Sequence, residues 1–145
     1  MRRTALVAIV LSGNLIFRVA AAEIAENASL LSKENVVDVA SGGGSWTSAS
    51  VGQALAVRDR LRTGEDSRAA VRMTDLSVLR VDEFTETEIL APRMGSAKPT
   101  LNLKQGSAYF FSREQAGEVQ LETPAANGAI RGTEFAATVD RKSVV

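Results

Sequence analysis

Short runs in which apolar and polar side chains alternate recur along this chain and restrict what it can fold into. In one such run Ala69, Val71 and Met73 occupy every second position. A period of two is the spacing of side chains on one face of a β-strand. The alternation is clearest in four runs, at residues 68–74, 85–89, 119–123 and 133–139.

Residues that favour turns separate these runs. They fall at positions 41–45, 64–66, 92–99, 106, 117 and 127–128. No long segment has the period of an amphipathic helix, although Leu55, Val57 and Leu61 fit one or two helical turns. The pattern predicts an all-β fold, either a twisted antiparallel β-sandwich or a short β-solenoid-like domain.

The N-terminus has the order of a secretory signal peptide. Arg2 and Arg3 precede an apolar stretch at 5–11, and Ala20-Ala21-Ala22 supplies small residues for cleavage. The alternatives are a buried N-terminal helix and an uncleaved membrane anchor, which needs about 20 consecutive apolar residues. We expect a signal-peptide helix at 1–22 with cleavage near Ala22, a flexible lead-in at 23–35, and one β domain at 36–145. The expected location is periplasmic or otherwise extracytoplasmic.

The composition narrows the chemistry that the chain can perform. It contains no histidine and no cysteine, so it cannot form Ser-His-Asp or Cys-His catalytic sites, ordinary zinc sites or disulfides. Without residues 1–22, which hold three arginines and no acid, 14 basic residues remain against 17 acidic ones. A mildly acidic domain is a poor partner for nucleic acid. We expect no enzyme activity, no cofactor, no metal and no nucleic-acid partner.

Several segments, in order along the chain, resemble the FecR family of extracytoplasmic domains. They are 45–46 with 51–55, 59–64 with 67–69, 76–81 with 85–89, 103–106 with 108–111, and 123–124 with 129–135. Each segment alone is a weak signal, whereas the ordered series is specific. The candidate interface positions within these motifs are Trp46, Arg62, Thr63, Gly64, Gly106, Tyr109, Phe110, Phe111, Arg131, Gly132, Thr133, Glu134 and Phe135.

The resemblance implies a periplasmic domain that acts in regulation or signal relay through contact with an envelope or membrane protein. The best-known family arrangement joins such a domain to a cytoplasmic anti-sigma segment, and we expect no such segment here. The alternative is an envelope structural or glycan- or protein-binding module without regulatory output. The family pattern also continues beyond its final motif, so we expect a C-terminally truncated domain with an open strand edge, which favours self-association.

The motif residues carry local expectations. Gly64 and Gly106 are expected in turns with positive φ. Gly132, inside an alternating run, indicates a bulge or a close backbone contact. Arg131 and Glu134 would lie on opposite strand faces unless Gly132 bulges. The family commonly has Asp-Gly-Ser where this chain has residues 75–77, and because leucine disfavours positive φ, this turn is expected to differ in type.

Three further features have two interpretations each. The single tryptophan, Trp46, either covers the end of the core or offers a stacking platform for a sugar. If Phe110 lies in the core, Tyr109 and Phe111 face outward, or the reverse. The acidic residues at 82–88 either form a solvated strand face or supply the paired carboxylates of a glycoside hydrolase. The solvated face is the expected state of such acids.

Overall fold

The alternating runs form the strands of a single curled sheet. A computed structural model describes residues 28–94, 99–112 and 117–140. Its strands are β1 (Ala28–Glu34), β2 (Val37–Ala40), β3 (Thr47–Ser48), β4 (Ala54–Leu55), β5 (Arg60–Thr63), β6 (Arg68–Met73), β7 (Val78–Val81), β8 (Glu86–Leu90), β9 (Thr100–Phe111), β10 (Gly117–Glu122), β11 (Asn127–Gly132) and β12 (Glu134–Val139). The all-β prediction is confirmed. The expected signal-peptide helix lies outside the described residues.

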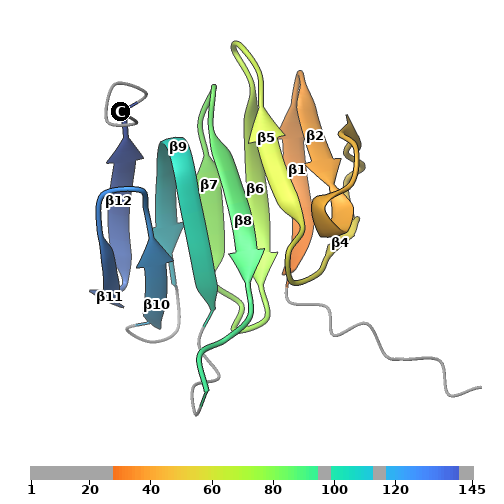
Figure 1. Cartoon of the computed structure of the whole chain (residues 1–145). Coiled ribbons are helices and arrows are strands. Elements are labelled where there is room, and N and C mark those ends of the chain that lie inside the picture. The colour runs from red at the N-terminus through yellow and green to blue at the C-terminus, as the bar shows by residue number, and fades with distance from the viewer. Residues whose placement is uncertain (1–27, 95–98, 113–116, 141–145) are drawn as a thin grey trace, which may run out of the picture.

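The sheet folds over on itself into a half-barrel with two layers (Figure 1). In layer A the strand order is β4-β1-β6-β7-β9-β12, and in layer B it is β3-β2-β5-β8-β9-β10-β11. Strand β9 belongs to both layers because its first half pairs with β8 and its second half with β7. The described pairs are antiparallel except that of β9 with β10.

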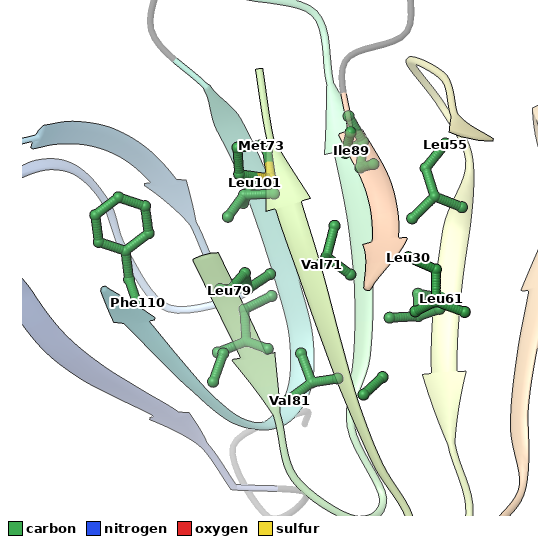
Figure 2. Packing of buried hydrophobic residues seen from close by; sticks show 14 of the residues in the cluster. Leu30, Leu55, Leu61, Val71, Met73, Leu79, Val81, Ile89, Leu101 and Phe110 are labelled. Atoms are coloured by element: carbon green, nitrogen blue, oxygen red, sulfur yellow. The ribbon is translucent and has the colours of Figure 1, made fainter. Parts of the chain in front are cut away.

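The core lies between the inner faces of the two layers. Its buried side chains occupy alternate positions along each strand, as in β6, where Ala69, Val71 and Met73 are buried. Figure 2 shows Leu30, Val71 and Leu79 from layer A among Leu61, Ile89 and Leu101 from layer B, with Phe110 to one side of this group. Because one face of each strand is buried, the alternation read from the sequence divides each run into one set of core residues and one set of surface residues.

The chain passes between the layers at four corners along one edge of the half-barrel (upper edge in Figure 1). The corners lie between β1 and β2, between β5 and β6, between β7 and β8, and in the middle of β9. Each corner holds one residue with positive φ, and these are Asn35 (56°), Asp66 (48°), Phe84 (50°) and Gly106 (89°). Left-handed backbone produces the sharp bend that carries a strand from one layer to the other.

Hydroxyl groups satisfy the backbone where the corners interrupt the sheet. We call Thr63, Ser67, Thr85 and Ser107 the corner ladder. The backbone N–H of Thr85 donates to Oγ1 of Thr63 at 3.0 Å, and the N–H of Ser107 donates to Oγ1 of Thr85 at 3.0 Å. Oγ of Ser67 accepts the N–H of Val36 at 3.0 Å. Ser67 and Thr85 are 0% and 1% exposed, so these bonds replace strand pairing in a place that water does not reach.

The lead-in prediction is wrong for the described part of that segment. Ala28–Glu34 forms β1, which pairs with β6 and β4 and buries Leu30 to 1% exposure. A bulge between Leu30 and Ser32 interrupts the alternation of β1, which explains why the sequence pattern does not show it.

One further local prediction is also wrong, and one local pattern has no counterpart among the described residues. The expected break at Asn127-Gly128 lies within β11, and the chain reverses at residues 123–126 instead, where the N–H of Thr123 donates to the carbonyl of Ala126 at 2.8 Å. The suggested helical turns at 55–61 are absent from the described structure, where β4 and β5 occupy this segment. Arg58, with a φ of 72°, turns the chain between them.

Leu76 takes the backbone conformation that the sequence analysis considered too costly for leucine. Its φ is 65° and its side chain is 61% exposed. The N–H of Leu76 donates to the carbonyl of Met73 at 3.0 Å, and the carboxylate of Asp75 accepts the N–H of Ser77 at 3.1 Å. These bonds hold the β6–β7 turn in place, so the turn imposes the strained conformation on leucine.

We expect Leu76→Gly to stabilise the fold by about 0.5–1 kcal/mol, because relief of the left-handed strain exceeds the added entropy of glycine in the unfolded chain. Urea unfolding followed by circular dichroism measures the change. The matched control is Val51→Gly, at a residue that is 60% exposed and does not have positive φ. The control should lose about 0.4–1 kcal/mol. Equal losses in both variants would contradict the assignment of strain to Leu76.

Substitution by alanine should affect the stability of the fold strongly at Gly106 and very little at Gly132. A Cβ on Gly106 would lie 2.3 Å from Oγ1 and 2.5 Å from Cα of Thr85, whereas one on Gly132 would meet nothing nearer than 3.7 Å. We therefore expect Gly106→Ala to cost about 2–4 kcal/mol through overpacking and strain. Gly132→Ala should change stability by no more than about 0.5 kcal/mol. Thermal unfolding of the two variants tests this contrast, and a similar melting temperature for both would refute it.

Candidate functional site

The outer face of layer B is covered by paired charges. Arg62 contacts Asp38 at 2.9 Å, Arg60 contacts Glu86 at 3.6 Å, and Lys104 contacts Glu88 at 2.8 Å. Both Glu86 and Glu88 thus form ion pairs with cations of neighbouring strands. The geometry favours the interpretation of 82–88 as a solvated, charged strand face.

Trp46 lies on this charged face. Its ring is 4.8 Å from the guanidinium of Arg60 and 4.4 Å from that of Arg62. Within the described structure it is half-buried and does not join the hydrophobic cluster of the core. The expectation that Trp46 covers the end of the core is therefore wrong, because cation–π contacts to two neighbouring arginines hold the ring on the surface instead.

The three residues of the Arg62-Thr63-Gly64 motif each have a different structural role. Arg62 reaches outward to Asp38, and Thr63 belongs to the corner ladder. Gly64 does not have the predicted positive φ. Its importance lies in close packing, because a Cβ there would approach Cβ of Val36 to 3.2 Å. Gly64 also joins two corners, since its N–H donates to the carbonyl of Val36 at 3.0 Å and its carbonyl accepts the N–H of Phe84 at 3.2 Å.

The motif at residues 131–135 spans the end of β11 and the start of β12. Phe135 stacks on Phe110 with ring centroids 4.9 Å apart, which ties the motif to the core. Glu134 begins β12 and faces outward, where it accepts a hydrogen bond from the Tyr109 hydroxyl. Arg131 lies in β11, where it stands opposite Glu118 of β10. Arg131 and Glu134 thus lie on different strands, and the bulge considered for Gly132 does not form.

The outer face of layer A carries a hollow that Phe111 lines and that Tyr109 does not. Phe110 is 0% exposed, so Tyr109 and Phe111 take the outward orientation of the two alternatives. In the register of layer A, Val78 pairs with Phe111 and Arg80 pairs with Tyr109. The hollow has a volume of about 790 Å³ and is lined by Leu31, Ser32, Lys33, Glu34, Arg68, Ala69, Ala70, Leu76, Val78, Arg80, Val81, Asp82 and Phe111.

The chemistry of this layer A hollow differs from that of the charged face. Its lining includes the small side chains of Ser32 and Ala70, and the apolar side chains of Leu31, Val78 and Phe111 are only half-buried. Leu76, the strained residue of the β6–β7 turn, stands at its rim. Apolar side chains gathered in an exposed hollow are typical of an interaction site for another molecule.

Among the residues that line the hollow, Phe111 was a candidate interface residue from its sequence, whereas Leu31, Leu76 and Arg80 were not. Tyr109, another candidate, lies outside the hollow. Leu31 lies at the bulge in β1, and Arg80 reaches Tyr109 only through pairing of β7 with β9. The one available signal was Leu76, a departure from the glycine that is common in the family.

Neither a metal-binding cluster nor a membrane-spanning helix is found in the described part of the chain. Residues 28–94, 99–112 and 117–140 contain no group of three or more acidic side chains that could hold a metal ion. Over the same ranges, no helix has the length and hydrophobicity needed to cross a membrane.

The curled sheet, with a charged outer face on layer B and an apolar hollow on layer A, defines an all-β domain. A family model described as "FecR protein" matches residues 59–145, which is more than half of the chain. The chain belongs to the FecR family. Comparisons with curated proteins and with solved structures found no match.

The hydrogen bond between Tyr109 and Glu134 can be tested by titration, because Tyr109 is the only tyrosine. Donation to the Glu134 carboxylate, together with partial desolvation and the negative charge of Glu134, raises the pKa of Tyr109 above 10.0, while Arg80 opposes the shift. Because the folded pKa exceeds the unfolded one, the stabilising contribution is complete below about pH 10 and is lost as the pH rises through the folded value.

We expect ultraviolet titration to place the pKa of Tyr109 above 10, and Glu134→Gln to lower it by removing the carboxylate charge. Fluorescence of the single tryptophan reports whether the fold persists at each pH. Glu88→Gln, on the opposite face, is the matched control and should leave the titration unchanged. An identical tyrosine pKa in the wild type and in Glu134→Gln would show that the bond does not form in solution.

Proposed function

We propose that this chain is an exported FecR-family domain that acts in extracytoplasmic regulation by binding a protein of the envelope or membrane. The observation that carries the proposal is the layer A hollow, in which Leu31, Val78 and Phe111 remain partly exposed beside Leu76. We further propose that the domain binds without catalysing a reaction. The absence of histidine and cysteine and the engagement of Glu86 and Glu88 with cations support this view.

The other motif residues support assignment of binding to layer A. On layer B the outward-facing Arg62 stacks on the ring of Trp46 and forms an ion pair with Asp38. Thr63, Gly64 and Gly106 serve the corners. The layer A hollow is where motif side chains and exposed apolar groups coincide, and it is therefore the surface that best fits a protein partner.

The strain at Leu76 supports the same assignment. Glycine would form this turn without strain, and an exposed leucine adds little to the core. Strained residues persist at binding sites because the side chain serves a function there. Leucine at the rim of the hollow provides an apolar contact, while Lys33, Arg68 and Arg80 around it would attract carboxylates of the partner.

Export is part of this proposal and is supported by the order of residues 1–22. Cell fractionation followed by N-terminal sequencing of the mature protein tests it. Cleavage near Ala22 and recovery outside the cytoplasm are the expected results. An unprocessed cytoplasmic product would contradict export while leaving the binding surface untested, so the two parts are examined separately.

The binding surface can be tested by photo-crosslinking in cells of the native host. A photoreactive amino acid at Val78 should give one adduct with an envelope or membrane protein, and Leu76→Glu should reduce the adduct at least about tenfold, which corresponds to about 1.4 kcal/mol of binding free energy. The same amino acid at Val51, the same residue type at a position that is 60% exposed, is the control and should give none. Equal adducts from both positions would reject the layer A hollow.

A transcription measurement beside the crosslinking experiment separates a regulatory role from the alternative of an envelope-binding module. Deletion of the gene or Leu76→Glu should change the transcription of a defined set of genes if the contact is regulatory. An adduct that persists in cells whose transcription does not respond to either change would support binding without regulatory output.

A further inference from the structure

The two ends of the curled sheet differ in how their edges are protected. At one end the edge strands β3 and β4 have two residues each, which leaves little backbone for another strand to pair with. At the other end β11 and β12 have six residues each. Short edge strands are one way in which proteins prevent pairing with other chains, so only the second end is long enough to accept a strand.

The pairing of β12 with β9 determines which backbone groups point away from the sheet. The N–H of Ser112 donates to the carbonyl of Thr133 at 2.8 Å, and the register continues from Glu134 opposite Phe111 to Val139 opposite Gly106. In an antiparallel pair every second residue bonds to the partner strand. The backbone groups that bond to β9 are therefore those of residues 133, 135, 137 and 139. The N–H and C=O groups of Glu134, Ala136 and Thr138 point to the open side.

The side chains of β12 do not protect this edge. The strand contains one charged residue, Glu134, and neither lysine nor proline, which are the residues that commonly block edge pairing. Its inward side chains Phe135 and Ala137 pack against the core but remain half-exposed. Among the described residues, β9 is the single strand that pairs with β12.

We propose that the open edge of β12 pairs antiparallel with β12 of a second copy of this chain, with the two-fold axis at Ala136. This register bonds all three outward residues, Glu134, Ala136 and Thr138, to the second copy. It places Phe135 opposite Ala137 of the other chain on the inner face, where both would be covered further. It joins the A layers of the two copies into one continuous sheet.

Charge selects this register over its neighbours. Glu134 stands opposite Thr138 of the second copy, and the two Glu134 carboxylates lie about four residues apart along the strands, or roughly 13 Å. A shift that centres the axis on Ala137 would place Glu134 opposite Asp140, which is unfavourable for like charges. A shift to Phe135 would leave Thr138 without a partner in the second copy. Only small side chains meet at the axis when it lies on Ala136.

The sharpest test is Ala136→Pro, because the N–H that proline removes points to the open side and not to β9. Sedimentation equilibrium at about 100 µM should show a dimer for the wild-type chain and a monomer for Ala136→Pro, with the same far-ultraviolet circular dichroism spectrum. Ala137→Pro, whose N–H bonds to β9, should instead destabilise the fold. A wild-type monomer at this concentration would overturn the proposal.

A second pair of variants keeps the proposal testable if Ala136→Pro does not fold. Ala136→Lys places two like charges at the axis and should weaken the dimer at least about tenfold. Ala129→Lys, its matched control, adds the same charge to the exposed β11 edge strand of layer B and should leave the dimer intact. Loss of the dimer in Ala129→Lys alone would identify β11 as the contact and reject β12.

Because the chain contains no cysteine, Ala136→Cys provides a direct probe of the axis. A short bis-maleimide should link two copies through residue 136, whereas Ser48→Cys on the two-residue edge strand β3 should not be linked. Leu76→Glu should leave the dimer unchanged, so failure of the dimer proposal and failure of the layer A binding surface give different results.

Discussion

The corner ladder is the interaction on which the rest of the structure depends. A strand that bends from one layer to the other loses its backbone pairing at the bend, and a buried N–H or C=O without a partner costs about 1–3 kcal/mol. Hydroxyls of Thr63 and Thr85 bond to the backbone of adjacent corners, and Ser67 does the same for Val36. The chain contains no cysteine and therefore no disulfide, and these hydroxyl groups bridge the corners at which the sheet folds over.

The geometry of the corners gives structural roles to several of the motif residues. Gly106 needs positive φ and also lacks space for a Cβ beside Thr85. Gly64 has neither strain nor positive φ, but Val36 packs directly against it. These positions determine the fold, and the fold then leaves layer A with an apolar hollow and layer B with a network of ion pairs. The corners determine which side chains of layer A face outward, and these side chains form the hollow that is the candidate binding surface.

The elements that were predicted correctly are those with strict alternation. Strand β6 coincides with the alternating run around Val71, and β12 with the run that follows Gly132. Strand β1 was missed because its bulge breaks the alternation at Leu31. Trp46 was misplaced because its position depends on Arg60 and Arg62, which approach it only when β5 pairs with β2.

The sequence by itself determined the strand class of the domain, its FecR membership and the set of residues that alternate between core and surface. It could not decide whether Tyr109 and Phe111 or Phe110 would face outward, because a period of two is the same for both choices. Tertiary structure made that decision by stacking Phe110 on Phe135. It also imposed positive φ on Leu76, since the β6–β7 turn is held by bonds to Met73 and Asp75, whose strength exceeds the local preference of leucine.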